Sequence, residues 1–248
     1  MSERPSERPT RGIGSPGSGP MPHARAIRFK DRHDAGRRLA ELLEPYRREQ
    51  PVVVALPRGG VPVAAEVARA LDAPLDVAVV RKIGAPQNSE YAIGAVAEGG
   101  VHVLGRRVGR AADLSGAELD ALITQAEHEL EERLRRYRGT RPPVALDGRT
   151  VIVVDDGLAT GRSALAAVRS LRRRGAARVI LAAPVASREA AGLLSEAADE
   201  VVCVEIPADL WAVGAWYDDF RATTDEEVAA LLIENAEAAA TSQRQSSQ

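Results

Sequence analysis

The chain has 248 residues, 45% of them hydrophobic, which is enough to bury the core of one α/β domain with elaborations. Its formal net charge of -2 gives no overall basic field, so the composition does not support binding to nucleic acid or to an anionic membrane. The single cysteine, Cys203, excludes an intrachain disulfide, and no apolar run reaches the roughly 18 residues of a membrane span. We therefore expect an unexported, cytoplasmic protein that acts on small molecules.

The N-terminal segment differs in composition from the domain that follows it. Residues 1–22 are rich in Ser, Pro, Gly and Arg without apolar periodicity, so we expect a disordered tail. The domain is expected over 23–236 and opens with DAGRRLAELLEPY, whose apolar spacing predicts a helix that starts near Asp34. The apolar run 51–56 then predicts a strand, and a helix is expected near 61–71.

The loop between this strand and helix, LPRGGVP, has the features of an anion-binding turn. Arg58 offers a guanidinium fork, and Gly59 and Gly60 expose backbone N–H groups. Pro62 suits the first turn of a helix. The alternative is an ordinary turn, which would need no arginine.

A second strand, expected over 74–80, leads into VVRKIGAPQNSEYAIGAVAE, which predicts a long polar loop able to close over a ligand. Lys82 lies where the strand ends. An exposed hairpin with ordinary surface charges is the alternative. The runs AIGAVAE and VHVL read as a short pair, and a charged insertion at about 106–140 contains a helix over 115–138 that packs on the core or on a second subunit.

The run VIVVDDGLATGRSA places two acids, Asp155 and Asp156, where a buried strand ends. In a parallel sheet, ligands bind beyond this end of the strands. The turn after the acids suits a phosphate, because its backbone N–H groups and a helix N-terminus attract anions. The turn residues expected to bind are Gly157, Ala159, Thr160, Gly161, Arg162 and Ser163. Carboxylates beside a phosphate cradle indicate a sugar phosphate; the alternatives are that Asp156 caps the next helix, or a dinucleotide fold, whose G-x-G-x-x-G spacing is missing here.

The remaining pattern alternates between helices and strands. A helix at about 161–174, a strand at 177–185, a helix near 187–195 and a strand at 199–205 indicate a parallel sheet covered on both faces. The segment 207–236 holds four of the eight aromatic residues and a capped helix that starts at Thr224 or Asp225. Its aromatic side chains either stack on a base or attach the last helix to the sheet. A disordered tail is expected over 237–248.

VIVVDDGLATGRSA resembles the 5-phosphoribosyl-1-pyrophosphate (PRPP) signature of type I phosphoribosyltransferases. The resemblance implies a Rossmann-like parallel-sheet core with a flexible loop, the helical insertion and a C-terminal hood over about 207–236. It implies that Asp155 and Asp156 hold the ribose 2′ and 3′ hydroxyls and that Ala159 to Ser163 bind the 5′-phosphate. LPRGG then stands at the pyrophosphate loop of the family, which often contains a non-proline cis peptide, and we expect one near Arg58.

The segment 79–98 is similar to the flexible catalytic loop of adenine phosphoribosyltransferases. This similarity implies that Arg81 or Lys82 reaches the leaving pyrophosphate, and that Glu90 and Tyr91 approach the nucleophile. Residues 27–235 also resemble an uncharacterised bacterial group of predicted phosphoribosyltransferases.

The resemblance implies Mg²⁺-dependent transfer of ribose 5-phosphate from PRPP to a nitrogen of a small acceptor, in nucleotide metabolism. Mg²⁺ would bridge the pyrophosphate and the ribose, with Asp155 and Asp156 mostly one water away. Ala159 stands where hypoxanthine and guanine enzymes carry an aspartate, which favours an adenine-like or non-purine acceptor over 6-oxopurines, and Trp216 and Tyr217 are candidates to contact it. The alternative is a non-catalytic PRPP or nucleotide sensor on the same fold. A homo-oligomer, a dimer, is expected.

Overall fold

A five-stranded parallel sheet forms the centre of the protein. The computed structural model describes residues 28–86, 88–104 and 114–246. The strand order is β2-β1-β6-β7-β8. The strands are β1 (Val52–Ala55), β2 (Leu75–Val77), β6 (Thr150–Val154), β7 (Arg178–Val185) and β8 (Glu200–Glu205). Helices cover both faces, which explains why the strands read as continuous apolar runs and confirms the predicted α/β class.

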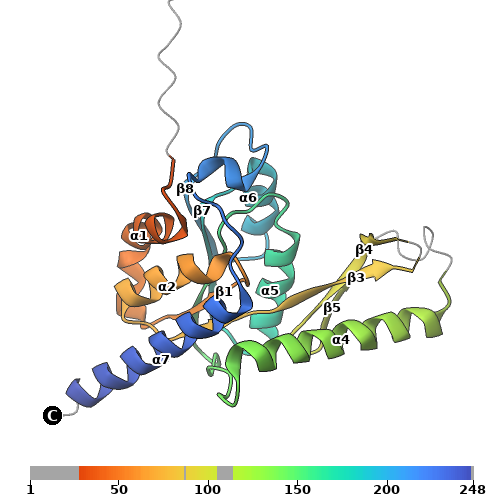
Figure 1. Cartoon of the computed structure of the whole chain (residues 1–248), viewed down its shortest axis with the longest axis horizontal. Helices are drawn as coiled ribbons and strands as arrows, with labels where there is room; N and C mark the ends of the chain where they lie inside the picture. Colours follow the sequence, from red (N-terminus) through yellow and green to blue (C-terminus); the bar gives the residue numbers. More distant parts are fainter. Residues whose placement is uncertain (1–27, 87, 105–113, 247–248) are drawn as a thin grey trace, which may run out of the picture.

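Side chains of alternate strand residues enter two separate cores. Val53 and Ala55 face α1 (Arg32–Leu43), α2 (Gly60–Leu71) and α7 (Asp225–Ser246), whereas Val52 and Val54 face α5 (Arg162–Arg173) and α6 (Arg188–Ser195) (Figure 1). Two short 3₁₀ helices, η1 (Glu44–Glu49) and η2 (Val213–Trp216), complete the connections. The helices and strands expected after residue 28 all form, and except for the end of α7 they lie within a few residues of their predicted ends.

The segment expected as a long loop is instead part of a second sheet. Strands β3 (Val80–Ala85), β4 (Asn88–Ala97) and β5 (Val101–Leu104) are antiparallel and project from the core alongside α4 (Gly116–Arg138) (Figure 1). The predicted pair AIGAVAE and VHVL lies within β4 and β5. The loop prediction was wrong because Ile83 and Val96 face inward onto Ala126 and Leu130 of α4, a tertiary contact that polar local composition does not reveal. We call β3, β4, β5 and α4 the arm.

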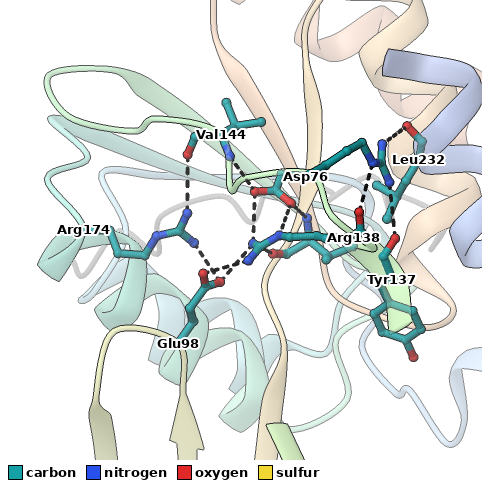
Figure 2. Close-up of polar contacts among 9 residues, drawn as sticks. Asp76, Glu98, Tyr137, Arg138, Val144, Arg174 and Leu232 are labelled. Carbon is teal, nitrogen blue, oxygen red and sulfur yellow. Dashed lines mark hydrogen bonds and ion pairs between the residues drawn. The ribbon is translucent and has the colours of Figure 1, made fainter. Parts of the chain in front are cut away.

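A buried ion-pair network joins the arm to the central sheet. Arg138, at the end of α4, contacts Asp76 of β2 at 2.8 Å and Glu98 after β4 at 2.8 Å (Figure 2). Arg174 reaches Glu98 at 3.1 Å from the end of α5. Asp76 and Arg138 are only 5% and 8% exposed. The helical insertion is therefore packed on the core of its own chain, one of the two placements expected.

The C-terminal helix is longer than the sequence pattern suggested. α7 continues to Ser246, so the expectation of a disordered tail from residue 237 is wrong for the part that the structure describes. The residues NAEAAATSQRQ are rich in good helix formers, and a helix already held by packing propagates through them. The expected N-terminal tail, 1–22, lies outside the described residues. Within the described part of the chain, no helix has the length and apolar character needed to cross a bilayer.

Candidate active site

Two loops meet at the carboxyl edge of the sheet because their strands are neighbours. β1 pairs with β6 in parallel, with Ala55 opposite Val154, and the Leu56 N–H donates to the Val154 carbonyl at 2.8 Å. The loop 56–60 after β1 and the loop 155–161 after β6 therefore start side by side. We call them the first and second loops.

The two loops pack so closely that glycine is required between them. A Cβ at Gly60 would lie 2.7 Å from the Val154 carbonyl oxygen, and one at Gly59 would overlap Oδ2 of Asp156. The structure thus brings Gly59 and Gly60 against the acid pair. Sequence reasoning placed these residues in one site, and the contacts show that the two loops touch.

Arg58 follows a cis peptide and is directed toward the start of α7. The Pro57–Arg58 bond is cis, which confirms the expectation of a non-proline cis peptide near Arg58. The guanidinium is half exposed, and its Nη1 lies 3.8 Å from Oδ1 of Asp225. Asp225 also accepts hydrogen bonds from Arg136 at 2.7 Å and Tyr137 at 2.8 Å. Burial alone would raise the pKa of Asp225, but these hydrogen bonds hold it below its usual value.

The two acids of the second loop have different surroundings. Asp155 Oδ1 accepts the Asp156 N–H at 2.9 Å. Burial, and then the negative charge of Asp156, raises the pKa of Asp155 well above its usual value. Asp156 has a cation beside it. The negative charge of Asp156 is therefore balanced by a partner, whereas a negative charge on Asp155 is unfavourable.

Arg32 is the cation beside Asp156, and sequence reasoning missed it. Its Nε and Nη2 both lie 2.8 Å from Asp156 Oδ2, and its Nη1 donates to the Arg221 carbonyl at 2.7 Å. The guanidinium lies 3.9 Å from the ring centroid of Phe220, and Arg32 is only 9% exposed. One signal was present: Arg32 falls on the helix face that includes Ala35 and Leu39, and a charge on an apolar face needs a buried partner.

The second loop ends in an open helix N-terminus. Gly161 has a φ of 68° and precedes α5, which has no side-chain cap, so the alternative that Asp156 caps this helix is excluded. The Ser187 hydroxyl braces the loop by donating to the Ala159 carbonyl at 2.6 Å. Thr160, Arg162 and Ser163 are exposed beside the free N–H groups of the first helical turn. This geometry suits a phosphate.

The hood closes over the second loop from the C-terminal side. Tyr217 is 3% exposed, and its hydroxyl donates to the Asp156 carbonyl at 2.6 Å. Its ring lies against Phe29 and Phe220, with centroids 5.3 and 4.9 Å away, which favours the attachment role over base stacking for this residue. Trp216 is half-buried beside this cluster. Val213 occupies the space that a side chain at Gly157 would need.

The basic residues of the arm lie apart from this arrangement. Arg81 pairs with Glu129 of α4 at 2.5 Å, so the structure does not bring its charge to the two loops. Lys82 is exposed and, as the next residue on the strand, points to the opposite face. The structure does not describe the side chains of Glu90 and Tyr91. Elsewhere on the molecule, a cavity of about 290 Å³ lies between α1 and α7, with Arg32 in its wall.

Comparisons with known proteins agree with this geometry. The family model "Phosphoribosyl transferase domain" matches residues 29–219. Two strains of Mycobacterium tuberculosis have proteins named "Putative phosphoribosyl transferase" that are 47% identical over 204 residues, covering 82% of this chain and 46% of theirs. The chain thus spans about half the length of these curated relatives. The crystal structure of the protein TT1426 from Thermus thermophilus is 50% identical with a TM-score of 0.73, covering 84% of this chain and 99% of that one. The uracil phosphoribosyltransferase of Agrobacterium fabrum is 45% identical over 62 residues, 23% of this chain and 29% of that protein.

A parallel α/β sheet with an acid pair between two glycine-containing loops at its carboxyl edge has the arrangement expected of a protein that binds sugar phosphates. The chain belongs to the phosphoribosyltransferase family.

Proposed function

We propose that this protein transfers ribose 5-phosphate from PRPP to a nitrogen of a small acceptor and releases pyrophosphate. One observation carries the proposal: the first and second loops, each built to bind an anion, touch at one edge of the sheet with Asp155 and Asp156 between them. PRPP has two phosphorylated ends and a diol between them. The pentose would lie against the acids, the 5′-phosphate in the turn 159–163, and the pyrophosphate at Arg58, Gly59 and Gly60.

Breaking the bond between C1 and the pyrophosphate oxygen creates positive charge on the sugar ring and negative charge on the leaving group. Arg58 and the backbone N–H groups of Gly59 and Gly60 would stabilise the leaving group, and preorganised charges of this kind contribute most of such rate enhancements. Asp155 and Asp156 would orient the ring through its hydroxyls and oppose its charge. Lys82 and Glu90 are proposed to join the site if the arm bends toward the loops.

Mg²⁺ is proposed as the cofactor. Among the described residues, no group of three His, Cys, Asp or Glu side chains forms a site for a metal ion. Asp156 is engaged by Arg32, and the residues therefore fit a hydrated ion that takes most of its ligands from the substrate. When bound, Mg²⁺ would neutralise charge on the pyrophosphate.

The acceptor is proposed to be adenine-like or a non-purine base. Ala159 provides no carboxylate at the position where the hypoxanthine and guanine enzymes carry an aspartate to accept a proton from a 6-oxopurine. The local likeness to a uracil phosphoribosyltransferase supports including pyrimidines. Trp216, which is half-buried at the hood, is the aromatic candidate to contact the base.

A second candidate, a PRPP or nucleotide sensor without catalytic activity, is favoured by the position of Arg81. Its pairing with Glu129 leaves Arg58 to stabilise the leaving group in this conformation. A sensor needs the binding loops but no further cation at the pyrophosphate.

Pyrophosphate release from PRPP, measured across a panel of purine and pyrimidine bases with Mg²⁺, tests the proposal. We expect release with one acceptor class, reduced by about 10² to 10³ in kcat for Asp155→Asn and for Arg58→Ala. PRPP binding without release for any base would identify a sensor instead. Release that is unchanged in both variants would remove the assigned roles.

A further inference from the structure

We propose that Arg32 is a positioning residue that sets the orientation of the Asp156 carboxylate for the ribose diol and ties that orientation to the closed hood. The inference rests on the proposed function, because it concerns how the acid pair recognises a pentose. No pattern in the sequence links Arg32 to the second loop, 124 residues away.

Arg32 contacts only one of the two carboxylate oxygens of Asp156. Both Nε and Nη2 end on Oδ2, each at 2.8 Å. Arg32 thus does not occupy Oδ1, which in the proposed arrangement accepts a ribose hydroxyl hydrogen bond. Two donors on one oxygen also restrict rotation of the carboxylate, so Oδ1 is held in a fixed direction.

Arg32 touches each part of the site that would surround the sugar. Its Nη1 donates to the Arg221 carbonyl, and its guanidinium covers the Phe220 ring, so it contacts the hood twice. Its Nε lies 3.1 Å from where a Cβ of Gly59 would be, so the first loop passes directly beside it. A shift of the hood would move Arg32, and with it Asp156.

Lysine cannot reproduce this arrangement. The side chains of Arg32 and Asp156 are 10% and 15% exposed, so the ion pair is largely removed from water. An ammonium group keeps the charge, but it lacks the planar fork that binds Oδ2 through two nitrogens and the hood through a third. The charge-conserving variant Arg32→Lys therefore separates position from charge.

The expected consequence is a loss of selectivity for the diol. We expect Arg32→Lys to weaken binding of ribose 5-phosphate by about 10- to 100-fold, the usual value of a hydrogen bond to a charged group. Binding of its 2,3-dideoxy analogue should change little, because the analogue offers Asp156 no hydroxyl. Isothermal titration of both compounds gives the ratio of their affinities for each protein.

Arg28→Lys is the matched control. Arg28 also donates to a hood carbonyl, that of Tyr217 at 3.1 Å, and pairs with Asp218, but it does not contact the acid pair. Its substitution should leave the affinity ratio unchanged. If Arg32→Lys does not fold, Phe220→Leu loosens the guanidinium without removing it and should lower the ratio by about threefold.

The outcomes separate the two ideas. A wild-type protein that binds both compounds equally well would show that the acids do not hold the diol, and the assigned sugar site would fail with this proposal. A wild-type preference for ribose 5-phosphate that persists in Arg32→Lys and Phe220→Leu would overturn the positioning role alone. An equal loss for both compounds in Arg32→Lys would likewise reduce Arg32 to a structural residue.

Discussion

Asp155 and Asp156 are adjacent and chemically identical, yet their surroundings give the two carboxylates opposite effects on stability. Arg32 binds both Asp156 and the hood, whereas Asp155 is partly buried beside another negative charge. A buried carboxylate with a raised pKa favours the protonated form, so its ionisation costs stability. Under the proposed function, the site therefore includes a residue that weakens the fold at neutral pH.

Asp155→Asn is expected to stabilise the protein increasingly as pH rises. The folded state holds the Asp155 proton more tightly than the unfolded chain does. The associated stability is fully present below the unfolded pKa of about 3.9 and is lost as pH rises through the raised folded pKa. The variant does not undergo this loss. Melting temperatures at pH 4, 6 and 8 should show a growing advantage, about 2–4 °C for each kcal/mol removed.

Asp156→Asn is the matched comparison and should have the opposite sign. It leaves the buried Arg32 guanidinium without its carboxylate, which typically costs about 3–5 kcal/mol. A destabilised Asp155→Asn at pH 8, or a stabilised Asp156→Asn, would contradict the assigned environments.

The local sequence pattern predicted the acid pair and the turn, but it did not predict the arginine that contacts Asp156. Asp155 to Ser163 are contiguous, so their spacing alone predicts the chemistry. Arg32 meets Asp156 only through packing of the first helix against the sheet edge. Tyr217 likewise contacts Asp156, through a hydrogen bond from its hydroxyl to the Asp156 carbonyl. The aromatic residues of the hood had suggested base stacking as readily as attachment of the last helix to the sheet.

At the scale of elements, the hood packs against the second loop at Gly157, where there is no room for a side chain. An added methyl at Gly157 would overlap the side chain of Val213 in η2. We expect Gly157→Ala to displace the hood and to lower stability by about 1–3 kcal/mol, the usual cost of overpacking. Adding Val213→Ala removes the overlapping methyl groups and should recover most of that stability. Thermal denaturation of the two single variants and the double variant checks this; additive losses would show that the two residues do not meet.

The arm depends on buried charge rather than on apolar area alone. Arg138→Met would leave Asp76, 5% exposed, without a cation, at an expected cost of about 3–5 kcal/mol in urea unfolding. Arg172→Met is the control, because its partner Asp199 is well exposed and such pairs contribute at most about 1 kcal/mol. Equal losses in the two variants would show that the network does not hold the arm.

The elements that sequence reasoning found and those it missed differ in the range of their contacts. β1, β6 and β7 are continuous apolar runs, so they can be predicted as buried strands without knowing which helices cover them. β3 contains Gly84, Pro86 follows it, and polar residues lie in both β3 and β4. The two strands form a sheet because α4, which begins at Gly116, covers one face. The length of α7 was missed for a different reason: its last turns have helix propensity but little apolar patterning.

At the scale of the whole molecule, one ligand is proposed to contact three regions that are far apart in sequence. The first loop, the second loop and the hood are joined through Gly59, Asp156 and Arg32. PRPP at 100 times its Kd should therefore stabilise the fold by about 2.7 kcal/mol and raise the melting temperature by roughly 5–10 °C. Hydrogen exchange should slow together in residues 58–62, 157–163 and 213–221, because opening any one of these segments would release the same molecule. Helix η1, which precedes β1 at the opposite edge of the sheet, serves as an internal reference in the same experiment. Protection confined to 157–163 would mean that only a phosphate is held there, and that the first loop and the hood do not share its ligand.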